Sequence, residues 1–186
     1  MPNPVQDLSQ FRLPPEGRGR PRWIVQLWWI VQSVLFSPSP QFMFGWRRWL
    51  LRCFGAKIGH QVLIRSSAKI LYPWNLTIGD WSWIGDDVVL YSAGQITLGS
   101  HVVISQRGYL CAGTHDLTRP DFQAVYLSII VEDEAWLTTD VFVAPGVNIG
   151  RGAVVGARSS VFSDLPAMMV SHGTPAMPKR HRLEHT

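Results

Sequence analysis

The feature that most constrains the fold is an aliphatic residue that recurs every six positions over more than half of the chain. The series runs from Ile58 to Val161, with two steps of eight residues and one of 21. Because a period of six drifts around a 3.6-residue helical turn, these residues cannot line one side of a helix. The fifteen positions are Ile58, Ile64, Ile70, Ile78, Ile84, Leu90, Leu98, Ile104, Leu110, Val131, Leu137, Val143, Ile149, Val155 and Val161.

A strand accommodates the same pattern, because residues i and i−2 of a strand lie on one face. The residue two positions before each aliphatic residue is small or aliphatic in all fifteen cases. Glycine often follows directly, as at Gly59, Gly79 and Gly150, and we expect it to permit the backbone conformation of a corner. Short strands separated by such corners coil into a triangular prism whose coils stack on one another. The sequence therefore predicts an all-β solenoid, a parallel β-helix of about five coils.

Composition agrees with a single folded domain and limits the classes of partner. The chain has 186 residues, of which 46% are hydrophobic and 16% charged, and this excludes wholesale disorder. The net charge of +4 comes from basic residues near both ends, so no basic stripe indicates nucleic-acid binding. We predict a helical, basic-aromatic arm at 1–55, the β-helix at 56–165 with an inserted loop at 112–128, and a tail at 166–186. Two cysteines in no spacing motif and no cleavable signal peptide indicate a cytoplasmic protein.

One segment of the arm is strongly apolar. It begins at Trp23, ends at Phe36 and reads WIVQLWWIVQSVLF, which is 14 residues. A membrane-spanning helix needs roughly 20 apolar residues, so this segment is too short to cross a bilayer. Two interpretations remain: a helix packed on its own protein or a neighbouring subunit, or a helix lying at the inner face of the membrane as a peripheral contact.

Several segments resemble a known family. They are WRRWLLRCFGAKIG, YPWNLTIGDWSWIGDDVVLYS, ISQRGYLCAGTHD, VAPGVNIGRGAVVGARSSV and DLPAMMVSHGTPA, and they cover most of the chain from Trp46 to Ala176. They are similar to the hexapeptide-repeat acyltransferases, in particular to the colanic acid biosynthesis acetyltransferase branch. The resemblance alone implies a left-handed β-helix, since general chain topology favours right-handed crossovers. It also implies a homotrimeric O-acetyltransferase that uses acetyl-CoA and a sugar or lipid-linked glycan acceptor.

The repeat breaks between Leu110 and Val131, where 21 residues take the place of six. A loop of this length on a rigid scaffold is a common place for functional residues. It contains His115, and a neutral imidazole can remove a proton from a sugar hydroxyl at cytoplasmic pH. The resemblance implies that His115 is the general base of a direct transfer, with a backbone N–H near the break stabilising the oxyanion. Asp116 either orients the imidazole or begins the loop as a turn residue.

Other chemistry in this region has weaker support. Cys111 could be a nucleophile, although it follows the inward Leu110 and is better interpreted as structural. A metal-dependent hydratase of the same fold binds zinc through three histidines, but His60 and His101 lie on other coils and no paired-histidine spacing accompanies His115. We therefore expect no metal. A non-catalytic assembly subunit is disfavoured by the presence of the THD sequence.

The resemblance also implies a binding region for the donor. Trp136 matches a tryptophan near the acetyl-donor channel, and it could equally be an interface aromatic. Thr139 and Ala157 match positions that contact the pantetheine arm. Phe162–Ser163 and Met177 depart from the family pattern, which leaves Lys179 and Arg180 as the expected phosphate partners or as a solvated basic tail.

For the acceptor we expect Asp87 to hold sugar hydroxyls and Trp74 to stack on a pyranose ring. Each residue has a structural alternative, Asp87 as a turn and Trp74 as a plug in a corner. The outward Trp81, Trp83 and Trp136 indicate an interface between subunits, in agreement with a homotrimer.

Overall fold

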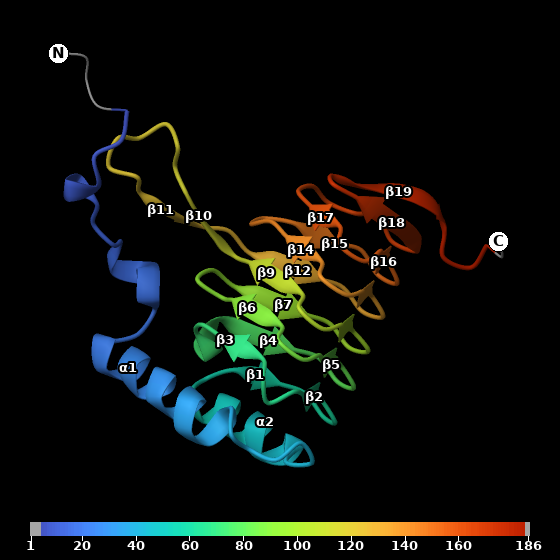
Figure 1. Cartoon of the computed structure of the whole chain (residues 1–186), viewed down its shortest axis with the longest axis horizontal. Helices are drawn as coiled ribbons and strands as arrows, with labels where there is room; N and C mark the ends of the chain where they lie inside the picture. The colour runs from blue at the N-terminus through green and yellow to red at the C-terminus, as the bar shows by residue number, and fades with distance from the viewer. Residues whose placement is uncertain (1–4, 185–186) are drawn as a thin grey trace.

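The computed structural model describes residues 5–184, and a parallel β-helix forms its centre (Figure 1). Three sheets are its faces. The first face is β1 (Lys57–Ile58), β4 (Leu76–Ile78), β7 (Ile96–Leu98), β12 (Ile129–Val131) and β15 (Asn148–Ile149). The second is β2 (Leu63–Ile64), β5 (Trp83–Ile84), β8 (Val103–Ile104), β13 (Trp136–Leu137), β16 (Val154–Val155), β18 (Met169–Gly173) and β19 (Ala176–His181). The third is β3 (Lys69–Ile70), β6 (Val89–Tyr91), β9 (Tyr109–Cys111), β14 (Phe142–Val143) and β17 (Ser160–Val161).

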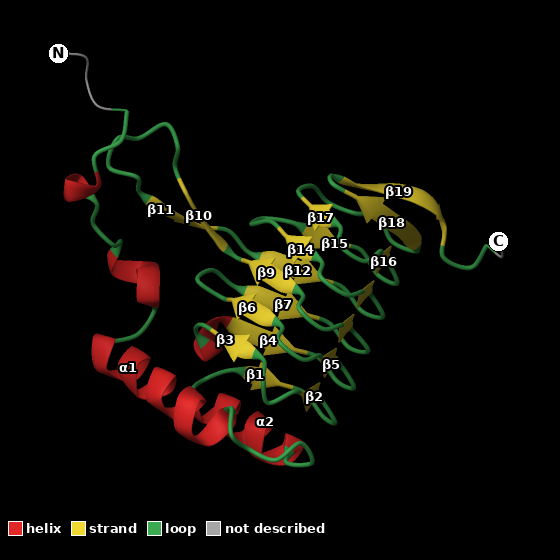
Figure 2. Cartoon of the chain, in the orientation of Figure 1, coloured by secondary structure: helices red, strands yellow, loops and turns green. Residues whose placement is uncertain are grey.

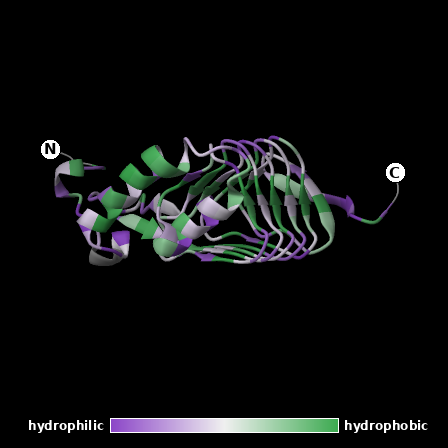
Figure 3. Ribbon diagram, turned by 90° about the horizontal axis from the view of Figure 1, so that it is seen from below, coloured by the Kyte–Doolittle hydropathy of each residue, from purple (hydrophilic) through white to green (hydrophobic). Residues whose placement is uncertain are grey.

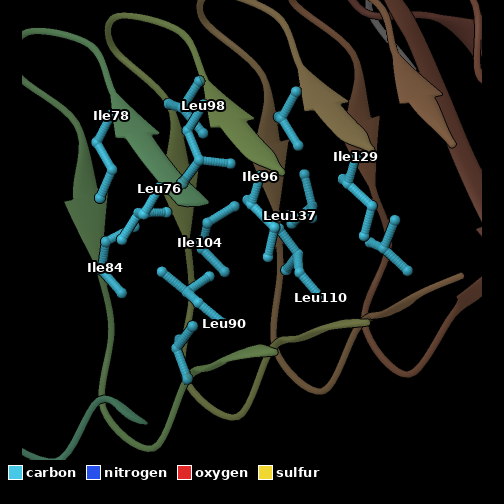
Figure 4. Close-up of a cluster of buried hydrophobic side chains, with 14 of the residues drawn as sticks. Leu76, Ile78, Ile84, Leu90, Ile96, Leu98, Ile104, Leu110, Ile129 and Leu137 are labelled. Carbon is cyan, nitrogen blue, oxygen red and sulfur yellow. The ribbon is translucent and has the colours of Figure 1, made fainter. Parts of the chain in front are cut away.

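The predicted repeat sets the register between coils. Ile58 pairs with Ile78 and Ile78 with Leu98, so one coil of the early part takes 20 residues. All fifteen aliphatic positions of the series are buried, each 8% exposed or less. Figure 4 shows side chains of this core pointing into the prism and lying above one another. The chain completes five coils and begins a sixth, where Leu165 bridges to Ile149. The parallel β-helix predicted from the sequence is therefore confirmed.

The glycines that follow the inward residues have a different role from the one we expected. Gly79 does not have a positive φ; a Cβ there would lie 2.5 Å from the backbone of Gly99 in the next coil. The left-handed conformation lies two residues further on, at Trp81 (φ 60°) and at His101 (φ 58°). The glycine thus allows close stacking of coils, and a residue with a side chain makes the corner.

Three corners separate the faces of the prism. The first corner joins the first face to the second, the second corner joins the second to the third, and the third corner leads from the third face to the next coil. The third corner is widened by the eight-residue steps, and its first copy contains the 3-10 helix η4 (Pro73–Asn75).

The N-terminal arm closes one end of the prism (Figure 1). It contains η1 (Leu8–Gln10), η2 (Pro15–Arg18), α1 (Arg22–Val31), the π-helix η3 (Gln32–Phe36) and α2 (Phe44–Cys53). Trp28 and Phe36 are fully buried and belong to the core cluster of the β-helix. The Trp28 indole N–H donates to the Ile70 carbonyl at 2.9 Å, and the Gln32 side chain accepts from the Ile70 N–H at 2.8 Å. The arm therefore packs on its own prism, and no helix within residues 5–184 is long and apolar enough to span a bilayer.

A buried arginine fixes α2 to the prism. The guanidinium of Arg47 is fully buried and donates to oxygens of Ile64, Ser39, Pro40 and Gln41. These acceptors are neutral, so the charge is balanced by several hydrogen bonds rather than by a carboxylate.

At the other end of the prism a β-hairpin extends the second face, and its strand next to the C-terminus is among the more hydrophilic parts of the ribbon (Figure 3). In the region that we expected to be a tail, β18 pairs with β16 in parallel and with β19 in antiparallel fashion. The second face is therefore two strands longer than the other two faces.

Candidate active site

The loop expected at 112–128 is a hairpin that projects from the third corner of the prism (Figure 2). Its strands are β10 (Gly113–His115) and β11 (Ala124–Tyr126), which pair in antiparallel fashion. At its base the Ala112 carbonyl accepts from the N–H of Gly94 and from that of Leu127. The hairpin is thus anchored to two neighbouring coils and holds His115 outside the repeat.

The imidazole of His115 is held on two sides by one residue. Its Nδ1 lies 2.8 Å from the Phe122 carbonyl oxygen, and its ring stacks on the Phe122 ring at 4.0 Å with an interplanar angle of 9°. Because a carbonyl oxygen only accepts, Nδ1 carries the proton of the neutral ring. Nε2 therefore keeps its lone pair for a substrate. Phe122 itself has a left-handed φ of 51°.

Asp116 forms a turn and does not contact the imidazole. Its Oδ1 accepts from the Thr118 N–H at 2.9 Å and from the Thr118 hydroxyl at 2.7 Å. These hydrogen bonds stabilise the carboxylate and hold the pKa of Asp116 below its ordinary value. Of the two roles considered from the sequence, the turn is the one these contacts fit, and orientation of the ring comes from Phe122.

A hollow of about 270 Å³ lies beside His115. Its wall comes from three regions that are distant in sequence: the hairpin, the third face and the N-terminal segment. The N-terminal segment is tied to the hairpin by a hydrogen bond from the Asp7 N–H to the Pro120 carbonyl, and the Phe11 ring lies 6.0 Å from the imidazole. The lining residues are Phe11, Leu13, Tyr91, Ala93, Gly113, Thr114, His115, Ala124 and Tyr126.

Sequence reasoning missed most of this wall. Phe11 and Leu13 precede the repeat and carry no periodic signal, so nothing in the sequence placed them beside residue 115. Tyr91 gave a weak signal, since it directly follows the inward Leu90 at the widened corner. Only His115 was expected among the lining residues.

The expected donor residues gather at the second corner. Thr139 and Ala157 lie at equivalent places, each two residues after an inward residue of the second face, and the Thr139 carbonyl accepts from the Arg158 N–H. Trp136 lies on the second face, 44% exposed, and its indole N–H donates to the Ser105 hydroxyl at 3.0 Å. A hollow of about 360 Å³ continues along the same corner, and its lining includes Trp83, Asp86, Ser105 and Gln106.

The basic pair expected for phosphates lies on β19. Lys179 is exposed, and Arg180 is half-buried and donates to the carbonyls of His181 and Glu184. Arg180 is therefore part of an ordered strand at the end of the second face.

The two expected acceptor residues are not brought beside His115. Asp87 lies at the second corner, with φ 55° and its N–H donating to the Ser67 hydroxyl. Trp74 lies in the third corner, where its ring stacks on Tyr72 at 5.0 Å and its indole N–H donates to the Arg18 carbonyl at 2.7 Å. These contacts correspond to the structural alternatives, a turn and a plug.

Cys111, His60 and His101 do not line the hollow. Cys111 donates from its thiol to the Gly113 carbonyl. His60 and His101 lie at the first corner, on a different edge of the prism from His115. Within residues 5–184 no three His, Cys, Asp or Glu side chains gather as ligands for a metal ion.

Comparisons with known proteins agree with the fold. The chain is 56% identical over 180 residues to colanic acid biosynthesis acetyltransferase WcaF of Escherichia coli strain K12, covering 97% of this chain and 99% of the relative. It is 34% identical over 110 residues to galactoside O-acetyltransferase of Lactococcus lactis subsp. lactis, covering 57% of this chain and 53% of that one. The crystal structure of a hexapeptide-repeat acetyltransferase from Vibrio cholerae with acetyl coenzyme A matches with a TM-score of 0.80 at 25% identity, covering 87% of this chain and 88% of that chain. No family model matches the chain.

Proposed function

Because the chain belongs to the hexapeptide-repeat acetyltransferases, whose β-helix is left-handed, we propose that it transfers the acetyl group of acetyl-CoA to a sugar hydroxyl of a polysaccharide precursor. The observation that carries this proposal is the contact of His115 Nδ1 with the Phe122 carbonyl oxygen at 2.8 Å. The Phe122 carbonyl holds the proton on Nδ1, and the ring lines a hollow at the place where the repeat opens. Names of relatives support the sugar, since one is a colanic acid biosynthesis acetyltransferase and another a galactoside O-acetyltransferase.

The proton path follows from this tautomer. Nε2 of His115 accepts the proton of the acceptor hydroxyl while the hydroxyl oxygen bonds to the thioester carbonyl carbon. The Phe122 carbonyl then stabilises the imidazolium through the Nδ1–H. When the carbon–sulfur bond breaks, the imidazolium returns the proton to the leaving thiolate. The products are the acetyl ester and free coenzyme A, and the histidine is restored.

His115 and the residues expected to contact the donor lie on different corners of one prism, which supports a site shared between copies. His115 projects from the third corner, whereas Thr139 and Ala157 lie at the second. The second face also exposes Trp83 by 54% and Trp136 by 44%, and large exposed apolar surfaces commonly mark interfaces. We infer a cyclic homotrimer in which the hairpin of one copy meets the second corner of its neighbour.

The histidine is tested by His115→Ala, with Leu117→Ala as the control in the same hairpin. Leu117 is 82% exposed and does not line the hollow. Turnover with acetyl-CoA and a galactoside should fall by about 10² or more in His115→Ala and remain near wild type in the control. Affinity for coenzyme A should be unchanged in both. Equal turnover of His115→Ala and wild type would exclude the general-base role.

The shared site is tested by complementation. Ala157→Trp fills the second corner and should be inactive, as should His115→Ala. Co-expressed, the two variants form mixed trimers in which some sites combine an intact His115 with an intact second corner, so activity should return. Light scattering should give about three times the mass of one chain. Failure to recover activity in mixed trimers of the correct mass would place the whole site within one copy.

The acceptor is tested in cells. Mass spectrometry of surface polysaccharide from cells with and without the gene should show loss of acetyl groups from one sugar position. An unchanged polysaccharide would exclude a polysaccharide precursor as the acceptor while leaving transfer to the galactoside intact.

A further inference from the structure

The helical segment 22–36, which comprises α1 and η3, has two apolar faces, and only one of them packs on the prism. Val25, Trp28 and Phe36 point inward and are buried. On the opposite side a second set recurs at i, i+4, i+7 and i+11, which places its members on one face of a helix. We call this set the arm stripe: Trp23, Leu27, Ile30 and Val34, which are 66%, 43%, 59% and 59% exposed.

The exposure of the arm stripe does not result from a loosely packed helix. Trp28 and Gln32 hydrogen-bond to the backbone of Ile70, so the rotation of the helix about its axis is fixed. The stripe therefore faces away from the prism as a constant feature. Trp29 and Leu35 beside it are also exposed, by 41% and 44%.

Positive charge lies at the Trp23 end of the arm stripe. Arg20 and Arg52 line one hollow of about 340 Å³ together with Trp23 and Leu27. Arg20 and Arg22 are exposed, and neither forms an ion pair with a carboxylate whose side chain the structure describes. Residues 1–55 contain seven arginines and only two acidic residues, Asp7 and Glu16. The Asp7 carboxylate accepts hydrogen bonds from Ser9 and Gln10.

Apolar side chains with tryptophan and arginines at their edge fit the interface of an anionic bilayer. Tryptophan suits the level of the headgroups, arginine attracts anionic lipid, and the aliphatic residues enter the acyl boundary. Pairing of two arms would instead bring the arginines of both copies together, although each arm has seven arginines and only two acidic residues. No helix within residues 5–184 could span the bilayer, so the contact would lie in its surface.

We propose that the arm stripe is a membrane-docking surface that recognises anionic phospholipid. The hollow between Arg20 and Arg52 is the place for a lipid phosphate, and the stripe supplies the buried apolar area. This inference does not depend on the proposed acetyl transfer.

The test is flotation of the full-length protein with vesicles of phosphatidylcholine, with and without phosphatidylglycerol. Wild type should float with the anionic vesicles at low salt and less at high salt. Ile30→Glu places a charge within the stripe and should weaken binding by about tenfold or more. Gln26→Glu is the matched control, because Gln26 is exposed on the same helix but outside the stripe, and it should retain most of the binding. Arg20→Gln with Arg22→Gln should weaken binding to anionic vesicles and reduce its dependence on salt.

Three results would overturn the proposal. One is a wild-type protein that floats with neither vesicle at any salt. Another is equal loss of binding in Ile30→Glu and Gln26→Glu. A third is a lower mass of Ile30→Glu in light scattering without vesicles, which would make the stripe an interface between copies. Transfer to a soluble galactoside, measured in parallel, should be unchanged in Ile30→Glu, so failure of the vesicle experiment and failure of the proposed function are separate results.

Discussion

The repeating prism and the hairpin that interrupts it obey different structural rules. In the prism, an inward side chain such as Leu98 packs between Ile78 and Val131, its equivalents in the two adjacent coils. In the hairpin, none of the six strand residues is buried. The hairpin is held at its base by Ala112 and at its tip by the N-terminal segment, through residues more than a hundred positions away in sequence.

The prism therefore determines the stability of the fold, whereas the hairpin positions the candidate catalytic histidine. The prism gives rigidity because each coil completes the core of the next, and a change there affects several neighbours. The hairpin places a half-buried imidazole against a backbone carbonyl and contributes little apolar burial. Substitutions in the two regions should therefore alter different properties.

The largest effect on stability is expected in the prism. Leu98→Ala removes a side chain that is 1% exposed and leaves a cavity between coils, which should lower the free energy of unfolding by about 2–5 kcal/mol. The control is Leu117→Ala in the hairpin, where the side chain is 82% exposed and the loss should be within about 0.5 kcal/mol. Denaturant unfolding of both variants measures the difference. Similar losses of unfolding free energy in the two variants would contradict the view that the prism, and not the hairpin, determines stability.

The sequence predicted the prism well because its rule is local and repeated. A six-residue period, a small or aliphatic partner at i−2 and the 20-residue coil were enough to predict the core and the register. The structural role of the glycines was not predictable from the sequence. A glycine such as Gly79 can be needed for a positive φ or for close packing of two coils, and only the distance to Gly99 in the next coil distinguishes these roles.

The site was less predictable because its contacts join distant segments. The break in the repeat indicated His115, and the resemblance supplied its role. The group that fixes the ring is a backbone carbonyl, that of Phe122, and backbone groups carry no residue-specific signal. The wall from Phe11 and Leu13 depends on how the N-terminal segment crosses to the hairpin, which no local pattern encodes.

An intermediate effect is expected for the residue that holds the ring. Phe122→Gly keeps the carbonyl and suits the left-handed φ of 51°, so it removes only the stacked ring. Loss of this stacking should lower kcat by about tenfold or less, with an unchanged KM for acetyl-CoA. Phe122→Tyr should restore kcat, and the His115 ring protons should lose their ring-current shift in the glycine variant only. An unchanged kcat in Phe122→Gly would remove the positioning role of the ring.

The smallest effect concerns two carboxylates, one in each region, whose pKa values are both below the ordinary 3.8 for different reasons. Asp116 in the hairpin is stabilised chiefly by the Thr118 hydroxyl and N–H, and Asp140 at the second corner chiefly by hydrogen bonding to Arg107. A lowered folded-state pKa gives a contribution to stability that is complete above 3.8 and is lost as the pH falls through the lower folded value. The protection of the Thr118 amide from hydrogen exchange, relative to its intrinsic rate, should therefore fall in this acidic range in wild type, and Asp116→Asn should remove that pH dependence.

Salt distinguishes the two carboxylates. The exposed ion pair between Asp140 and Arg107 should weaken as ionic strength rises, because screening reduces the attraction between the two charges. The hydrogen bonds from the neutral Thr118 to Asp116 should respond much less. Amide exchange at the second corner should thus depend on salt above the acidic range, whereas exchange at Thr118 should not. Equal salt dependence at the two places would mean that the hairpin turn relies on the nearby Arg119 rather than on Thr118.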